Sequence, residues 1–229
     1  MTAPPMRQPR VAVLDVNETL TDMSPLADRL ADVGLVGQLD GWFASVLRDG
    51  FALSLVGKAP SMRAVAAALL HSRLTAVGVN GSDADDGVAH VLGGFADLPV
   101  HPDVQPGLRR LHDAGVRLVP LTNGATALSD AVLDAAGLLP LIERRLSVDD
   151  VGPWKPHPAP YHYALTECDV EPGEAMLVAV HPWDIQGAHS AGLRTGWIER
   201  GTGGWPGCFD PPEVVASGLD DLADQVLAD

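Results

Sequence analysis

Apolar residues follow two different spacings along the 229-residue chain. Short continuous apolar runs are typical of strands that are buried on both faces of a parallel sheet. Longer stretches, with apolar residues three and four positions apart, predict helices. The runs that predict strands are 11–16, 116–122, 175–180 and 194–200, and residues 141–148 form a further short apolar stretch. The stretches that predict helices are 24–34, 40–57, 61–74, 82–95, 106–115, 125–137, 159–168, 184–192 and a short one from 218.

The order of these elements predicts an α/β fold with a doubly wound parallel sheet. Strands alternate with helices in the second half of the chain, which is the pattern of such sheets. After the first strand, however, four helices follow one another with no strand between them. We therefore expect residues 10–20 and 98–229 to form the α/β core, and residues 21–97 to form an inserted all-helical cap.

Composition narrows the class of function. Lys and Arg total 15 against 30 Asp and Glu, and the net charge of −15 argues against nucleic acids or anionic membranes as partners. The amino-terminal residues lack the apolar segment of a signal peptide, and no apolar run reaches the roughly 20 residues that span a bilayer. The two cysteines match no metal-binding or redox spacing. These features predict a cytoplasmic protein.

Polar residues gather where the predicted strands end. Ligands of an open parallel sheet bind outside the carboxyl ends of its strands, so these residues are candidates for a common site. A carboxylate there can attack an electrophilic carbon or phosphorus and leave an ester or acyl phosphate for water to cleave. A lysine can keep that carboxylate ionised and attract an anionic substrate. The candidates are Asp15, Thr19, Thr122, Asn123, Lys155, His181 and Asp184.

These residues, in this order, resemble the four motifs of the haloacid dehalogenase superfamily, and the resemblance covers essentially the whole chain. The resemblance implies an α/β core with an inserted cap, and a covalent intermediate on Asp15. It also implies that Asp184 orients Lys155 or accepts a proton from the attacking water. The matches are Asp15 and Thr19 in a DxxxT loop, Thr122 after an apolar strand, the pair Lys155-Pro156, and Asp184 after a further apolar strand.

Two positions indicate a branch of this superfamily that uses no metal. Most members are phosphatases that need Mg²⁺, with a second acid two residues after the nucleophile and a Gly-Asp pair in the fourth motif. Asn17 and Val180 stand at the places of those two acids. Because Mg²⁺ prefers carboxylate oxygens, the resemblance implies neither a metal nor another cofactor.

The L-2-haloacid dehalogenases are the metal-free branch, and this chain resembles them. They have a Tyr six residues after the motif Lys, matched by Tyr161, and a Trp-Asp pair, matched by Trp183-Asp184. The resemblance implies that Asp15 displaces halide from C2 of a short 2-haloacid, and that water hydrolyses the ester to a 2-hydroxy acid. It further implies a small anionic substrate and a homodimer. Expected substrate contacts are Asn17, Phe43, Asn123, Tyr161 and Trp183.

The chain also departs from this branch. An Arg that takes the departing halide is replaced by Phe43, with Arg48 one or two turns away as a substitute. The Ser and Asn of the fourth motif are replaced by Ala179 and His181. His181 is either a general base for ester hydrolysis or a strand-end residue that hydrogen-bonds Asp184. Two alternatives stay open: an Mg²⁺-dependent phosphatase, and a binding protein that kept the fold and lost turnover.

Overall fold

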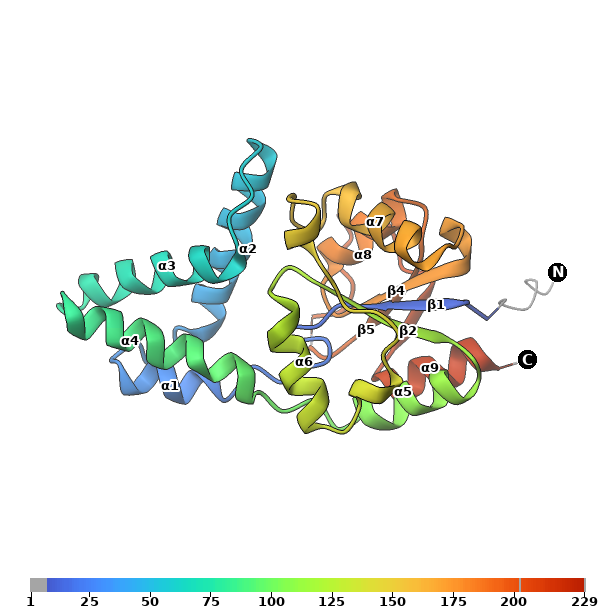
Figure 1. Cartoon of the computed structure of the whole chain (residues 1–229), viewed down its shortest axis with the longest axis horizontal. Helices are drawn as coiled ribbons and strands as arrows, with labels where there is room; N and C mark the ends of the chain where they lie inside the picture. Colours follow the sequence, from blue (N-terminus) through green and yellow to red (C-terminus); the bar gives the residue numbers. More distant parts are fainter. Residues whose placement is uncertain (1–7, 202, 229) are drawn as a thin grey trace.

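The structure is a computed structural model that describes residues 8–201 and 203–228 (Figure 1). Six parallel strands form one sheet in the order β3-β2-β1-β4-β5-β6, so the first strand lies in the middle. This arrangement confirms the predicted α/β class with a parallel sheet. The strands are β1 (Val11–Leu14), β2 (Arg117–Thr122), β3 (Leu146–Ser147), β4 (Ala175–Ala179), β5 (Arg194–Ile198) and β6 (Val214–Ala216).

Helices cover both faces of the sheet, because alternate residues of its central strand point to opposite sides. Ala12 and Leu14 belong to one hydrophobic cluster, and Val11 and Val13 belong to another. Figure 1 shows α5 and α9 on one face and α7 and α8 on the other. The helices of this part are α5 (Val104–Asp113), α6 (Thr126–Ala135), α7 (Pro158–Cys168), α8 (Pro182–Ser190) and α9 (Leu219–Leu227).

Four consecutive helices lie beyond the edge at which β1 ends, rather than on either face of the sheet (Figure 1). They pack around a cluster of their own, in which Trp42 and Leu70 are fully buried. Val132, Val148 and Trp154 from the second half of the chain join this cluster. The boundaries proposed for a cap, 21–97, stay a prediction. The helices are α1 (Leu26–Asp32), α2 (Leu39–Leu55), α3 (Met62–Ala76) and α4 (Ser82–Gly93).

The element bounds differ from the prediction mainly at short elements. The sequence indicated no strand at β6, because a three-residue edge strand is too short to display an alternating pattern. The apolar stretch 141–148 contains only two strand residues, since short 3-10 turns flank them. The two flanking turns are η2 (Leu139–Leu141) and η3 (Val148–Asp150). The structure also has the 3-10 turns η1 (Gly94–Asp97) and η4 (Pro172–Glu174).

Candidate active site

A buried lysine joins two carboxylates at the carboxyl edge of the sheet. Asp15 directly follows β1, and Asp184 lies in the first turn of α8, just after β4. Lys155 Nζ donates to Asp15 Oδ1 at 2.8 Å and to Asp184 Oδ2 at 2.7 Å. The lysine side chain has no exposed surface. The ammonium group of Lys155 is therefore bound by both carboxylates, and these two contacts fix its position relative to Asp15 and Asp184.

The loop that carries Lys155 is anchored on both sides. Asn123 Oδ1 accepts a hydrogen bond of 2.9 Å from the backbone N–H of Lys155. The neighbouring Trp154 donates through Nε1 to the carbonyl oxygen of Pro60, at 2.9 Å. Its ring packs directly against Gly50 of α2, where any side chain would overlap the indole. The helical segment thus holds the loop against the sheet edge, and Asn123 acts as an anchor for Lys155.

Tyr161 supports Asp184 from the opposite side. Its hydroxyl donates to Asp184 Oδ1 at 2.5 Å. Burial, together with the nearby carboxylate of Asp184, raises the pKa of Tyr161 well above 10.0, so the phenol remains a proton donor. Gly187 permits this contact, because a Cβ there would meet the Tyr161 hydroxyl and Pro156. Tyr161 has no exposed surface, and its predicted contact with substrate stays a prediction.

The second oxygen of Asp15 also has hydrogen-bonding neighbours. Thr19 Oγ1 donates to Asp15 Oδ2 at 2.6 Å, and His181 Nδ1 lies 3.0 Å from the same oxygen. Burial alone would raise the pKa of Asp15, but the charges and hydrogen bonds of Lys155 and His181 outweigh it and hold that pKa well below its usual range. Asp15 is therefore an ionised, buried carboxylate, as a nucleophile must be.

This arrangement does not fit the Mg²⁺ site of the phosphatases. Each oxygen of Asp15 and Asp184 already has a donor from Lys155, Thr19 or Tyr161. Across residues 8–201 and 203–228, no group of three or more His, Cys, Asp or Glu side chains is arranged to hold a metal ion. A buried ammonium group occupies the space between the two carboxylates, where a shared cation would lie.

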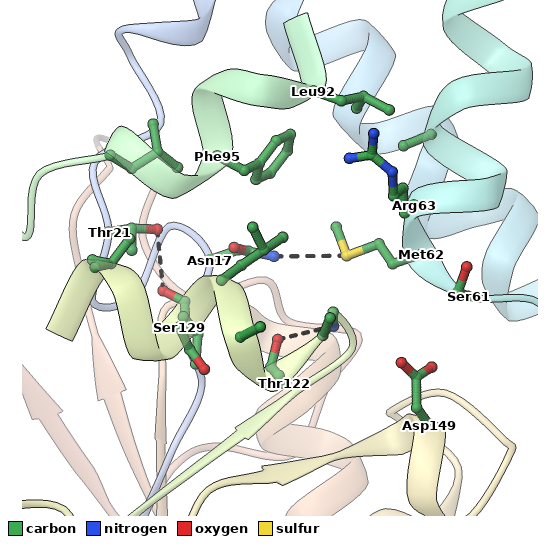
Figure 2. A pocket seen from close by; sticks show the side chains of 18 residues that line it. Asn17, Thr21, Ser61, Met62, Arg63, Leu92, Phe95, Thr122, Ser129 and Asp149 are labelled. Carbon is green, nitrogen blue, oxygen red and sulfur yellow. Dashed lines mark hydrogen bonds between the residues drawn. The ribbon is translucent and has the colours of Figure 1, made fainter. Parts of the chain in front are cut away.

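A cavity of about 260 Å³ lies between this edge and the helices α3 and α6. Asn17 and Thr122, two of the candidate residues, line it. Most of the remaining wall is apolar, and Arg63 of α3 supplies a cationic side chain. Figure 2 shows its guanidinium near Leu92, over the space that Asn17 borders, and Asp149 at another end of the cavity. The apolar lining residues include Val16, Met62, Ala66, Leu92, Phe95, Leu98, Leu128 and Val132.

Several of the residues considered for substrate binding lie away from this cavity. Phe43 is 4% exposed and packs in the cluster of the four helices, so its predicted place in the substrate site is not supported. Arg48 is exposed and pairs with Asp49 at 2.6 Å. Trp183 stacks on the imidazole of His181, with ring centroids 4.9 Å apart. Neither Phe43 nor Trp183 is part of the cavity wall.

Two residues of the site were missed in the sequence. Arg63 was overlooked because an arginine on the surface of a helix belongs to no recognisable motif. The available signal was that an anionic substrate needs a cationic side chain in its binding site. Glu18 stands where the branch that this chain resembles usually has a glycine, and it was not among the candidates. Its backbone has φ +63°, the left-handed region that favours glycine, and its Oε2 lies 2.7 Å from His181 Nε2. An acidic residue at a glycine position was the available signal.

The sheet and its edge cluster define an α/β protein with a buried Asp–Lys–Asp centre. The chain belongs to the haloacid dehalogenase-like hydrolase family, whose model matches residues 9–192. It is 27% identical to (S)-2-haloacid dehalogenase 1 of Pseudomonas sp. (strain CBS-3), over 95% of this chain and 96% of that protein. It is 32% identical to haloacetate dehalogenase H-2 of Moraxella sp. (strain B), but over 52% of this chain and only 53% of that protein.

The fold agrees with these relatives. The crystal structure of an L-2-haloacid dehalogenase superposes with a TM-score of 0.87 at 26% identity, covering 96% of this chain and all of that one. In the part of the chain that the structure describes, no helix has the length and apolar character that crossing a membrane requires.

Proposed function

We propose that this chain is a metal-independent hydrolase that removes halide from C2 of short 2-haloacids through an ester on Asp15. The observation that carries the proposal is the ionised Asp15 carboxylate, whose oxygens are held by Lys155 and Thr19 rather than left open to a metal. The full-length likeness to (S)-2-haloacid dehalogenase 1 supports the same reaction. The phosphatase alternative has weaker support, because the donors around Asp15 do not fit Mg²⁺.

The proposed reaction has two steps. In the first, an Asp15 oxygen attacks C2 from the side opposite the halide, so the carbon centre inverts and an ester forms. In the second, water attacks the carbonyl carbon of the Asp15 ester and releases a 2-hydroxy acid. Lys155 keeps Asp15 ionised before attack, and Asp184 with Tyr161 keeps Lys155 in place. Thr19 orients the attacking carboxylate.

We further propose that Arg63, rather than Lys155, attracts the anionic substrate. The charge of Lys155 is taken up by two carboxylates, and its side chain is fully buried. Arg63 lines the cavity and is exposed. Its guanidinium is suited to bidentate binding of a carboxylate. The apolar wall formed by Phe95 and Leu98 is suited to the alkyl group of a short acid.

The test is halide release from the full chain. We expect bromide or chloride from 2-bromopropionate or 2-chloropropionate, with one enantiomer preferred and with no loss of rate in EDTA. A single turnover in H₂¹⁸O is expected to place the label in Asp15, because water attacks the ester carbonyl. A folded protein that releases no halide from any short haloacid contradicts the proposal. Release that stops in EDTA contradicts the metal-free mechanism.

We also propose a cytoplasmic homodimer. The two cysteines, Cys168 and Cys208, are free thiols, which suits a reducing compartment. Four large apolar side chains are exposed on the segment of the four helices, and a second copy would cover them. A native mass consistent with two chains supports the dimer, and a monomer at micromolar concentration contradicts it. The four residues are Val36, Leu55, Val56 and Val77.

A further inference from the structure

The imidazole of His181 lies between two carboxylates. Nδ1 is 3.0 Å from Asp15 Oδ2, and Nε2 is 2.7 Å from Glu18 Oε2. An ionised carboxylate only accepts hydrogen bonds, so both contacts are hydrogen bonds only if both ring nitrogens carry a proton. The geometry therefore favours an imidazolium cation beside the nucleophile. A resting imidazolium can act as the general base expected from sequence only after it has released a proton.

Glu18 adopts a strained backbone to make this contact. Its φ of +63° lies in the left-handed region, which costs a residue other than glycine about 1–2 kcal/mol. The carbonyl oxygen of Glu18 is also held, at 3.2 Å from His101 Nε2. Strain of this kind persists where the surrounding structure requires it, and such places are often functional. Here the strained backbone directs the Glu18 carboxylate at His181.

The position of His181 also suits proton exchange with solvent. Its side chain is 12% exposed and lines a second cavity, of about 440 Å³. Asp15 is the more buried partner, and Trp183 stacks on the imidazole. The charged or titratable groups around His181 are Asp15 and Glu18 in contact, Lys155 and Asp184 behind Asp15, and Asp22, Asp40, His101 and Arg200 around the second cavity.

We propose that His181 carries the proton of the reaction, releasing it when Asp15 becomes a neutral ester and recovering it from the hydrolytic water. The proposal rests on the proposed function and deepens it. When Asp15 attacks, the carbon–halogen bond breaks and its electron pair leaves with the halide. The Asp15 charge that stabilised the imidazolium is lost in the same step. The Nδ1 proton then passes to solvent through the second cavity.

The second step restores the starting state. Neutral His181 takes one proton from water as the water oxygen bonds to the Asp15 carbonyl carbon. The acyl–oxygen bond then breaks, and the remaining proton of that oxygen passes to the departing alkoxide. The products are a 2-hydroxy acid, ionised Asp15 and imidazolium. The sum is one haloacid and one water giving one hydroxy acid and one hydrogen halide.

The first test needs no substrate. The protonation of His181 is followed by NMR of the full chain labelled with ¹⁵N-histidine, and its signals are assigned by their loss in His181→Asn. We expect an imidazolium at pH 7.5, because contact with Asp15 and Glu18 raises the pKa of His181 to about 9. In Asp15→Asn, whose amide imitates the neutral ester, we expect that pKa to fall by about 1–3 units. A neutral ring at pH 7.5, or no shift in Asp15→Asn, overturns the proposal.

The second test separates the two chemical steps. In His181→Asn we expect ester hydrolysis to slow by about 100-fold or more, so that the mass of an Asp15 adduct accumulates. His189→Asn, an exposed histidine near the end of α8, serves as the matched control and retains the rates of halide release and ester hydrolysis. A fall in halide release with no accumulated adduct overturns the proposal. Wild-type protein without any halide release contradicts the proposed function instead, and the NMR result still decides the protonation of His181.

Discussion

The polar cluster around Asp15 and the cavity beside it differ in how completely their polar groups are paired. In the cluster, Lys155 and Asp184 are fully buried, and their charged atoms make short hydrogen bonds. In the cavity, an exposed Arg63 stands among apolar side chains. A paired, buried network is rigid and costly to disturb, whereas an exposed cation is available to a ligand. The cluster is therefore suited to chemistry and the cavity to substrate binding.

Replacement of Lys155 tests the cluster most severely. Lys155→Met leaves Asp15 and Asp184 buried side by side without their shared cation. Loss of one partner of a buried ion pair costs about 3–5 kcal/mol, so we expect the free energy of unfolding at pH 7 to fall by that amount and turnover to vanish. Denaturant unfolding measures the first effect. Lys58→Met is the matched control, since Lys58 is exposed, and equal behaviour of the two variants would contradict the pairing.

The dependence of stability on pH tests His181 within the same cluster. Its pKa is raised from 6.5 to about 9 in the folded protein, so its ion pairs stabilise fully below pH 6.5. That contribution is lost as the pH rises toward 9, because the unfolded state has already released the proton. We expect the free energy of unfolding to fall by up to about 3 kcal/mol over this interval, which corresponds to about 1.4 kcal/mol for each pKa unit.

The matched comparison is His181→Asn, whose stability is expected to vary less between pH 6.5 and 9. Urea titrations at half-unit intervals give the two curves. Parallel curves for wild type and variant would show that His181 titrates alike in the folded and unfolded states. Such a result would remove His181 from the paired cluster.

The cavity is tested by removing its cation. Arg63→Met retains the apolar part of the side chain but loses the charge. A hydrogen bond to a charged group contributes about 1.5–3 kcal/mol, so we expect KM for 2-chloropropionate to rise about 10- to 100-fold with a smaller change in kcat. Arg48→Met is the control, because Arg48 pairs with Asp49 outside the cavity and its loss is expected to leave KM unchanged. A fall in kcat alone would place Arg63 in the chemistry instead of in binding.

The difference between cluster and cavity also explains what the sequence could predict. Asp15, Lys155 and Asp184 were found because strand ends meet at one edge of a parallel sheet, so their order along the chain implies proximity. The parallel sheet followed from short apolar runs in the same way. Arg63 was overlooked and the burial of Phe43 among the four helices was not foreseen, because the face that a helix turns toward the site depends on how helices pack on each other. The sequence identified Tyr161 as part of the site but did not show that it is buried. A tyrosine can either support a catalytic carboxylate from behind or contact the substrate, and the residue type alone does not distinguish the two.

The smallest expected effect comes from the outermost member of the cluster. Tyr161→Phe removes one hydroxyl and leaves Asp184 Oδ1 without its 2.5 Å donor, while Lys155 still holds the other oxygen. An unsatisfied buried acceptor costs about 1–3 kcal/mol, so we expect a loss of stability in this range and a fall in kcat of about tenfold. Because Tyr161 is buried and touches no substrate in this arrangement, KM is expected to stay constant.

Tyr163→Phe is the matched control for that variant. Its hydroxyl donates to Asp150 at 3.2 Å on the surface, and its removal is expected to change stability by less than about 0.5 kcal/mol. Initial-rate kinetics and denaturant unfolding of both variants decide the role of Tyr161. A rise in KM without a fall in stability would place Tyr161 in the cavity wall and would remove it from the cluster. A fall in stability and kcat at constant KM would confirm that Tyr161 acts on the reaction only through Asp184.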